Sequence, residues 1–377
     1  MNDALSSLRF DGDLPPSKVD IDRAVRTGRR RERRRRTLLA SAGIAGCALL
    51  VSGMLVAQDR QPPADTAVKN GCRVQRLPTP GNAPGTVTAT SGRYAVGVLD
   101  NPTGDPLLFW DDGRLRPVTG TPRPDPTPVA VDDSGTVVGN SGDKDPWLLR
   151  DGGFTHLATP AGATRTIATA INAKGSVIGT ATWLDAGGRA TQTRTVRWSV
   201  ADPGRFQYVA TDPALAYVSG INGDDVMVGR ASAGGTDYNA FAWTPDGTPV
   251  RLNRIDGKPA ESAFQVAGDW AIGSYDDGST WFSHGVRWNL RTGEHIEFDT
   301  FVPSAVDASG TMVGTVMNSA DDTAPARWKD GAVLMLPVLS AGQSATMTSM
   351  SSDGRVAVGW LFREKNDPIV PVRWLCS

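Results

Sequence analysis

Short apolar runs alternate with turns rich in Gly and Asp along most of this chain, and the alternation repeats at long range. A Val-Gly or Ile-Gly pair marks each repeat after residue 90, with gaps of 42, 40, 50, 44, 41 and 45 residues between successive glycines. These glycines are Gly97, Gly139, Gly179, Gly229, Gly273, Gly314 and Gly359. Self-similarity at this period is typical of an architecture in which each unit buries its apolar face against its neighbours.

The sixth unit, residues 304–337, shows the pattern within one repeat most clearly. Its apolar or alternating runs are separated by the turns Asp307-Ala-Ser-Gly310 and Lys329-Asp-Gly331. Runs of this length, bounded by such turns, predict four short antiparallel strands. Seven such units predict an all-β fold, a seven-bladed β-propeller of four-stranded antiparallel blades.

A tryptophan recurs in the third predicted strand, at Trp110, Trp198, Trp243, Trp288, Trp328 and Trp374. Unit two departs from this pattern, because Arg150 stands in that place and Trp147 lies three residues earlier. We expect the six tryptophans to pack between blades, since stacked sheets need large flat apolar side chains. We expect the recurring glycine to permit close backbone approach or a bulge at the inner strand pair.

Two stretches carry a resemblance to a known repeat. Residues Ala170 to Gly179 and Ala326 to Gly331 resemble the HAF-type extracellular repeat. That repeat has an alanine-isoleucine-asparagine strand, a glycine turn, a valine-valine-glycine strand and a tryptophan-aspartate-glycine strand end. The resemblance covers roughly residues 86 to 377. It implies a β-propeller displayed outside the cytoplasm, and it brings no catalytic residues, because structure-forming positions define the repeat.

The last unit stops at Cys376, just after its third strand, so it has no residues left for a fourth. Residues 72–79 resemble the fourth strands at 153–160 and 248–253. We therefore predict that residues 72–79 complete blade seven, which satisfies two open sheet edges at once. This closure brings Cys72 and Cys376 together, and a disulfide between them needs an oxidising compartment. The alternative is two unrelated free thiols.

Residues 37–57 form a run of 21 uncharged residues, which is about the length of a transmembrane α-helix. The basic run Arg29–Arg36 precedes it, and positive charge beside a span stays on the cytoplasmic side. The sequence therefore predicts a single-pass protein of the cell membrane. Its parts are a mostly disordered basic cytoplasmic tail (1–36), a signal-anchor helix (37–57), a stalk (58–71) and an extracellular propeller (72–377).

Other interpretations of the N-terminal region remain open. They are a secretory signal cleaved after Ala57, lipidation at Cys47, and twin-arginine export through Arg35-Arg-Thr-Leu-Leu39. The basic leader also resembles those of many actinobacterial single-pass proteins.

Charge is distributed unevenly along the chain. Residues 1–36 hold 11 basic and 6 acidic side chains, whereas the whole chain has a formal net charge of −1, so the remainder is acidic. We expect the Arg29–Arg36 run to set topology and to contact anionic lipid rather than nucleic acid. We expect the extracellular part to be monomeric.

Motifs for cofactors and catalysis are missing from the sequence. The chain has only three histidines, and it has neither a Gly-rich phosphate loop nor a Gly-x-Ser-x-Gly elbow. Its paired acids stand in turns, where Asp is favoured for conformational reasons. We therefore expect no cofactor, no metal site and no catalytic residue. The alternative is a polysaccharide hydrolase or lyase that uses acids brought together across the propeller channel.

The connections between the second and third strands of units three to five vary in length and carry aromatic residues. In propellers these loops emerge on the face where the innermost strands begin, which is the usual ligand face. We expect ligand-binding residues there, namely Trp183, Tyr238, Tyr275, Trp281, Phe282 and His284. Aromatic rings interleaved with Asp, Asn and Gly suit sugars or peptides, although each ring can instead cover a blade edge.

These observations lead to one functional hypothesis, a membrane-tethered extracellular propeller that binds a cell-envelope glycan or protein. A scaffold that only positions other envelope proteins is a third interpretation beside the hydrolase or lyase.

Overall fold

The computed structural model describes residues 68–377, apart from 101, 103–104, 123–124, 143, 212–214, 233–237, 253–260, 276–283, 318–322 and 364–366. The predicted tail 1–36, the predicted membrane span 37–57 and residues 58–67 lie outside the described residues. Within the part of the chain that is described, no helix has the length and hydropathy of a membrane span.

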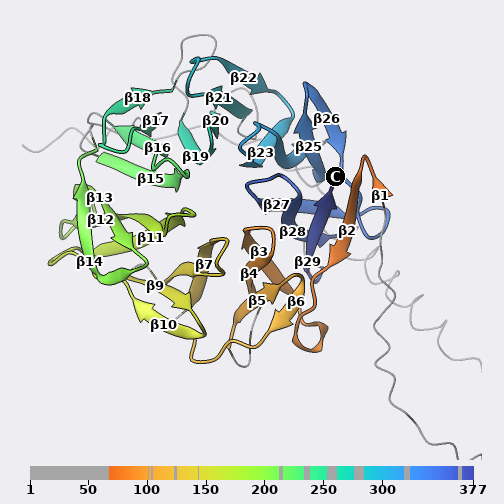
Figure 1. The fold of residues 1–377 in the computed structure, drawn as a ribbon, viewed down its shortest axis with the longest axis horizontal. Coiled ribbons are helices and arrows are strands. Elements are labelled where there is room, and N and C mark those ends of the chain that lie inside the picture. The colour runs from red at the N-terminus through yellow and green to blue at the C-terminus, as the bar shows by residue number, and fades with distance from the viewer. Residues whose placement is uncertain are drawn as a thin grey trace, which may run out of the picture. The chain divides into compact units, whose positions relative to one another are not determined.

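The described strands form seven antiparallel sheets arranged as the blades of a ring (Figure 1), six with four strands and one with five. Blade 1 contains β3 (Gly85–Thr90), β4 (Tyr94–Leu99), β5 (Leu107–Asp111) and β6 (Arg114–Arg116). Blade 2 contains β7 (Pro126–Val131), β8 (Val137–Ser141), β9 (Asp145–Arg150) and β10 (Gly153–His156). Blade 3 contains β11 (Arg165–Ile171), β12 (Ser176–Leu184), β13 (Ala190–Ser199) and β14 (Asp202–Val209). Blade 4 contains β15 (Leu215–Ile221), β16 (Met227–Ser232), β17 (Asn239–Trp243) and β18 (Pro249–Arg251).

The remaining blades keep the same order from the innermost to the outermost strand. Blade 5 contains β19 (Ser262–Ala267), β20 (Trp270–Tyr275), β21 (His284–Asn289) and β22 (His295–Phe298). Blade 6 contains β23 (Phe301–Val306), β24 (Met312–Met317), β25 (Thr323–Lys329) and β26 (Ala332–Met335). Blade 7 contains β27 (Ser344–Met350), β28 (Val356–Phe362), β29 (Val370–Cys376), β2 (Cys72–Arg76) and β1 (Val68–Lys69). A short 3₁₀ turn, η1 (Pro80–Asn82), leads from β2 into blade 1. The prediction of a seven-bladed propeller is confirmed.

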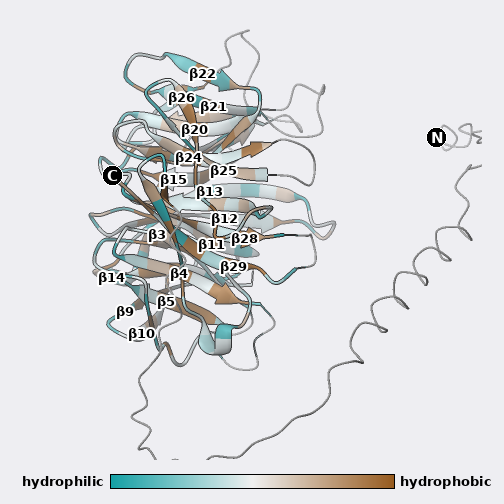
Figure 2. Ribbon diagram, turned by 90° about the vertical axis from the view of Figure 1, so that its right-hand side faces the viewer, coloured by the Kyte–Doolittle hydropathy of each residue, from teal (hydrophilic) through white to brown (hydrophobic). Residues whose placement is uncertain are grey.

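The ring has two faces, which differ in the connections they carry. The turns from first to second and from third to fourth strands lie on one face, which we call the turn face. The loops from second to third strands and the connections between blades lie on the other, the loop face. Seen from the side, the strands run between these two faces (Figure 2).

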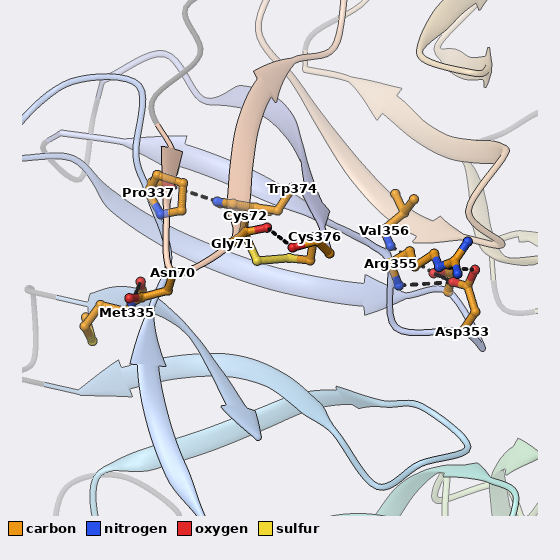
Figure 3. Close-up of a disulfide and its surroundings, with 12 residues drawn as sticks. Asn70, Gly71, Cys72, Met335, Pro337, Asp353, Arg355, Val356, Trp374 and Cys376 are labelled. Carbon is orange, nitrogen blue, oxygen red and sulfur yellow. Dashed lines mark hydrogen bonds and ion pairs between the residues drawn. A yellow bond between two sulfur atoms is a disulfide. The ribbon is translucent and has the colours of Figure 1, made fainter. Parts of the chain in front are cut away.

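The ring closes as the sequence predicts. Strand β2 pairs antiparallel with β29 and places Cys72 opposite Cys376, with 4.0 Å between their Cα atoms. The two residues form a disulfide (Figure 3). The backbone N–H of Ser377 donates to Gly71 O, so pairing continues past the bond. The first and last segments of the ring are therefore joined by the backbone hydrogen bonds between β2 and β29 and by one disulfide.

The ring also begins earlier than the sequence pattern indicates, because the end of the predicted stalk joins blade 7. Strand β1 adds a fifth strand outside β2 through a tight turn at Asn70-Gly71, where both residues have positive φ. The Asn70 side chain donates to Met335 O of blade 6 at 2.8 Å (Figure 3). This extra hairpin covers the outer edge of the closing blade, an edge that would otherwise be open to pairing.

The recurring tryptophans are buried between blades, as predicted, with exposed fractions from 0 to 9%. Among the contacts of the described residues, three of these tryptophans also tie their blade to the connection that leaves the preceding blade. The indole N–H groups of Trp110, Trp198 and Trp374 donate to Pro78 O, Ala158 O and Pro337 O.

Unit two fills the tryptophan position differently from the sequence-based assignment. The register pairs Val137 with Leu149, so Leu149 rather than Arg150 stands where the other blades have tryptophan. Trp147 lies opposite Gly139, and its ring occupies the space where a Cβ on that glycine would stand. The ring of Trp147 therefore fills the space that is left free because Gly139 has no side chain.

A bulge lies beside each recurring glycine, which confirms the prediction for these positions. Every innermost strand shifts register by one residue there, for example between Val87 and Ala89 or between Pro303 and Ala305. A Cβ on Gly314 would stand 2.1 Å from Val302 O, so only glycine lets the bulged strand approach this closely.

Side chains on the turn face connect neighbouring blades. Asn172 caps its own turn through Oδ1, while its Nδ2 donates to Asn222 O of the next blade at 2.9 Å. Asn222 repeats the arrangement and donates to Gly268 O at 2.8 Å. Each amide thus fixes a turn and joins two blades at once.

A buried cation joins blades 5 and 6. The guanidinium of Arg287 lies 4.1 Å from the ring centroids of both Trp270 and Trp328, and it donates to Gly310 O. Burial lowers the pKa of Arg287. Stacking between two indole faces compensates part of the cost of burying this charge.

Candidate functional site

The central channel is lined by the innermost strands of the blades and encloses about 350 Å³. Its described lining consists of Thr, Ser, Gln and Gly together with apolar residues, and it includes no Asp, Glu, His, Lys, Arg, Cys or Tyr. General acid–base chemistry needs a titratable group within hydrogen-bond reach of the substrate. The described channel wall supplies none.

Hydroxyl groups of the bulge residues in this wall hold blades together. Thr88 Oγ1 donates to Val96 O of its own blade and to Pro128 O of the next at 3.0 Å. Thr348 Oγ1 lies 2.9 Å from Val87 O, again in the next blade. These hydroxyls are already used for structure.

Acidic residues gather where the channel opens on the turn face, including Asp132, Asp133 and Asp224. Asp132 caps its own turn, since its Oδ1 accepts from Ser134 and from the N–H of Thr136. Burial raises the pKa of Asp133, and the charges of Asp132 and Asp353 add to this effect. The acids lie in turns, as the sequence analysis expected.

On the loop face, Tyr238 forms part of a cluster at the boundary of blades 3 and 4. Its ring packs edge-on against Tyr217, and the guanidinium of Arg230 lies over both rings, 4.8 Å from the Tyr238 centroid. Thr193 of blade 3 donates to the Tyr217 hydroxyl at 3.4 Å. Burial raises the pKa of Tyr238, Tyr217 reinforces the rise, and Arg230 opposes it.

Trp183 lies near the tip of the β12–β13 hairpin, on the side of blade 3 that faces blade 2. It is half-buried and packs against a cluster that includes Leu148 and Ala181. Thr193, by contrast, faces blade 4. The strand alternation of blade 3 therefore separates Trp183 from the Tyr238 cluster, and the two flank one hairpin instead of forming a continuous aromatic surface.

Tyr275 and His284 are buried, with exposed fractions of 3% and 6%. They pair across β20 and β21 and stack with 5.0 Å between ring centroids, and the Tyr275 hydroxyl donates to Glu297 Oε2. In the described structure these two rings face protein atoms rather than solvent. Trp281 and Phe282 lie outside the described residues.

A cleft of about 450 Å³, which the sequence pattern does not predict, lies between blades 4 and 5 on the turn face. Its lining includes Ala242, Leu252, Trp288, Leu290 and His295. The first four belong to one apolar cluster that joins the two blades. Only the spacing of these blades reveals the cleft, because each lining residue follows the ordinary strand pattern of its own repeat.

Metal ligands are not gathered in the described part of the chain: no three residues among its His, Cys, Asp and Glu are placed to hold a metal ion together.

Comparison with known proteins supports the fold alone. No protein family matches the chain, and no curated protein matches it either. The likeness to the HAF-type repeat therefore stays a prediction.

Among solved structures, an oligogalacturonate lyase in complex with manganese is 11% identical, covers 83% of this chain and 96% of its own, and has a TM-score of 0.53. The β-propeller domain of the Trilobed protease from Pyrococcus furiosus is 10% identical, with coverage of 77% and 93% and a TM-score of 0.53. A puromycin hydrolase mutant is 13% identical, covers 74% of this chain and 50% of its own, and has a TM-score of 0.50. The Pyrococcus propeller is described as having an open velcro topology, whereas here β2 pairs with β29.

Proposed function

We propose that this chain is a membrane-tethered extracellular binding module, a propeller of the HAF-repeat type that holds a cell-envelope glycan or protein on its loop face. A signal-anchor at residues 37–57 tethers it, and the Arg29–Arg36 run contacts anionic lipid on the cytoplasmic side. The Cys72–Cys376 disulfide supports an oxidising location, because such bonds persist mainly outside the cytoplasm.

The observation that carries this proposal is the cluster of Tyr238, Tyr217 and Arg230 at the boundary of blades 3 and 4. Two aromatic rings and a cation, all at the loop face, offer apolar contact and directional charge to a ligand. Aromatic and Arg side chains are the residue types that dominate binding energy at interfaces. The middle of the described channel has no titratable side chain, and the acids at its mouth lie in turns, an arrangement that supports binding over hydrolysis or elimination.

The test compares variants of the full chain for retention of purified cell-wall polysaccharides and of envelope proteins. Tyr238→Ala and Arg230→Ala should each weaken retention by about tenfold, as expected for anchor residues. Tyr208→Ala is the matched control, because Tyr208 is 44% exposed and lies under Arg194 on the outermost strand of blade 3. A similar loss in all three variants would contradict a site at the loop face.

Turnover provides the second readout. The same protein, incubated with a panel of polysaccharides that includes oligogalacturonate with manganese, should release no product. Release of product that depends on Asp133 would instead support the lyase or hydrolase alternative.

A further inference from the structure

We infer that the cleft between blades 4 and 5 is a second binding site, for an extended peptide that carries a basic residue next to a large apolar residue. This site lies on the turn face and is independent of the loop-face site proposed above.

The cleft runs outward from the mouth of the channel. Asn222, Asp224 and Gly268 line both the mouth and the cleft, which places its inner end at the turns between first and second strands. Its outer end is formed by Val250 and Arg251 of the outermost strand β18. An extended chain therefore fits radially, with one end near the axis and the other at the rim.

The floor of the cleft is apolar but does not expose aromatic faces. Ala242 and Leu252 come from blade 4, and Trp288 and Leu290 from blade 5. Trp288 is only 2% exposed, so its ring offers almost no surface on which a ligand could stack. Sugars stack on exposed aromatic faces, whereas an apolar side chain needs only a dry surface of this kind. The floor therefore suits the side chain of a large apolar residue.

Negative charge lies at the inner end of the cleft. Asp224 of blade 4 stands there and forms no ion pair within the described residues. At the outer end, Arg251 pairs with Phe241 across β17 and β18, so its side chain lies on the side of blade 4 that faces blade 3, where it donates to Asn239 Oδ1. On the blade 5 wall, Asp269 and Arg291 pair with each other at 3.4 Å, which leaves that wall nearly neutral. The unpaired carboxylate of Asp224 attracts a cation at the inner end of the cleft.

One buried nitrogen in the cleft has no partner. His295 pairs with Trp288 across β21 and β22, and its Nε2 is buried without a hydrogen bond. A buried polar atom that stays unpaired is costly, and a peptide main chain supplies both a carbonyl acceptor and an N–H donor at regular spacing. A main-chain group of the bound segment would satisfy this nitrogen.

The experiment measures fluorescence anisotropy of three labelled heptapeptides against the full chain. Each has a central Phe. The first carries Lys on one side and Glu on the other, the second carries Lys on both sides, and the third carries Glu on both sides. The two peptides that carry Lys should bind about fivefold or more tighter than the peptide with two Glu residues. Equal binding of the three peptides would overturn the inference.

Variants of the chain place the binding within the cleft. Val226→Trp fills it and should weaken binding of the mixed-charge peptide at least about tenfold, with the fold checked by circular dichroism. Asp224→Lys should reverse the preference in favour of the peptide with two Glu residues. Asp202→Lys and Arg205→Glu are matched charge reversals on blade 3, outside the cleft, and should change affinity less than about twofold.

His295→Phe provides a variant that does not depend on charge. It should weaken peptide binding several-fold while leaving the unfolding midpoint unchanged or higher, because it removes an unpaired buried nitrogen. Unchanged peptide binding in both His295→Phe and Val226→Trp would overturn the inference. So would binding of a neutral oligosaccharide, such as chitohexaose, that Val226→Trp abolishes while none of the peptides binds.

The two proposed sites are separable. Tyr238→Ala should leave peptide binding in the cleft intact, and Val226→Trp should leave polysaccharide retention intact.

Discussion

Reduction of the Cys72–Cys376 bond should lower the stability of the propeller by several kcal/mol. The bond closes a loop with a sequence separation of 304 residues. The chain-entropy relation for a loop of this size gives about 19 cal/mol/K, or about 5.7 kcal/mol at 25 °C. We take this value as an upper bound, because unfolded chains retain residual structure, and we expect a measured loss of about 3 to 5 kcal/mol.

The assay is urea unfolding of the unit from Gln61 to Ser377, with and without reductant. This unit contains only the two cysteines of the closure, because the third cysteine of the chain is Cys47. With an m-value of about 3 kcal/mol/M, the expected loss lowers the midpoint by about 1 to 1.7 M. The double variant Cys72→Ala/Cys376→Ala should match the reduced protein and should not respond to reductant.

Hydrogen exchange adds a spatial readout to the same experiment. After reduction, amides of β2 and β29 should exchange before those of β16, because only the closing blade is assembled from the two ends of the ring. Thiol titration establishes that reduction is complete. An unchanged midpoint in fully reduced protein would refute the reasoning that closure by the disulfide stabilises the ring.

Two further changes test the packing of the blades. Gly314→Ala should destabilise the propeller by about 2 kcal/mol or more in urea unfolding, because a Cβ there would stand 2.1 Å from Val302 O. Gly153→Ala is the control and should be nearly neutral, because its Cβ would lie 3.7 Å from Arg150 O. Equal effects of the two variants would contradict the role of the bulge. Asn172→Ala should cost about 2 to 3 kcal/mol near neutral pH, since it removes the donors to Asn222 O and to Asp225 Oδ1. Burial raises the pKa of Asp225, but the hydrogen bond from Asn172 and the charge of Lys174 lower it by more, so the pKa lies below its ordinary value. The wild-type stabilisation from this group is therefore complete above about pH 4 and is lost as the pH falls through the folded-state pKa. The difference in stability between wild type and Asn172→Ala should therefore shrink in acid to the part that comes from the bond to Asn222 O and the turn cap, and a constant difference would exclude this linkage.

Local chemistry explains which parts of the fold the sequence predicts well. The Val-Gly pairs, the Asp-Gly turns and the third-strand tryptophans each act within a single blade, so their period reveals the blade count directly. The closure follows from the same logic, because a last unit that lacks a strand and an N-terminal segment that resembles one complement each other. Cys72 and Cys376 occupy opposite positions in that pairing, which is why their bond was predictable.

The candidate sites depend on contacts between blades, which lie far apart in the sequence. Alternation along β20 and β21 shows that Tyr275 and His284 share a side of their sheet, but the packing of blade 4 against that side decides that both are buried. Likewise, Trp183 and Tyr238 occupy similar places in the sequences of repeats three and four, but Trp183 lies in β12 and the pleat of blade 3 directs it away from Tyr238.

The sequence by itself thus determined the repeat, the number of blades and the way the ring closes, because each of these rests on short-range patterns and one complementary pair of strands. Only the tertiary structure decided which rings face solvent, that Leu149 takes the tryptophan position of blade 2, and that a cleft lies beside Trp288 and His295 on the turn face. The physical reason is that a side chain is exposed or covered according to the volume of its neighbour in the next blade. That neighbour belongs to a blade about 40 residues away in the sequence, so the packing of the two blades decides which residue it is. The local alternation of polar and apolar positions does not.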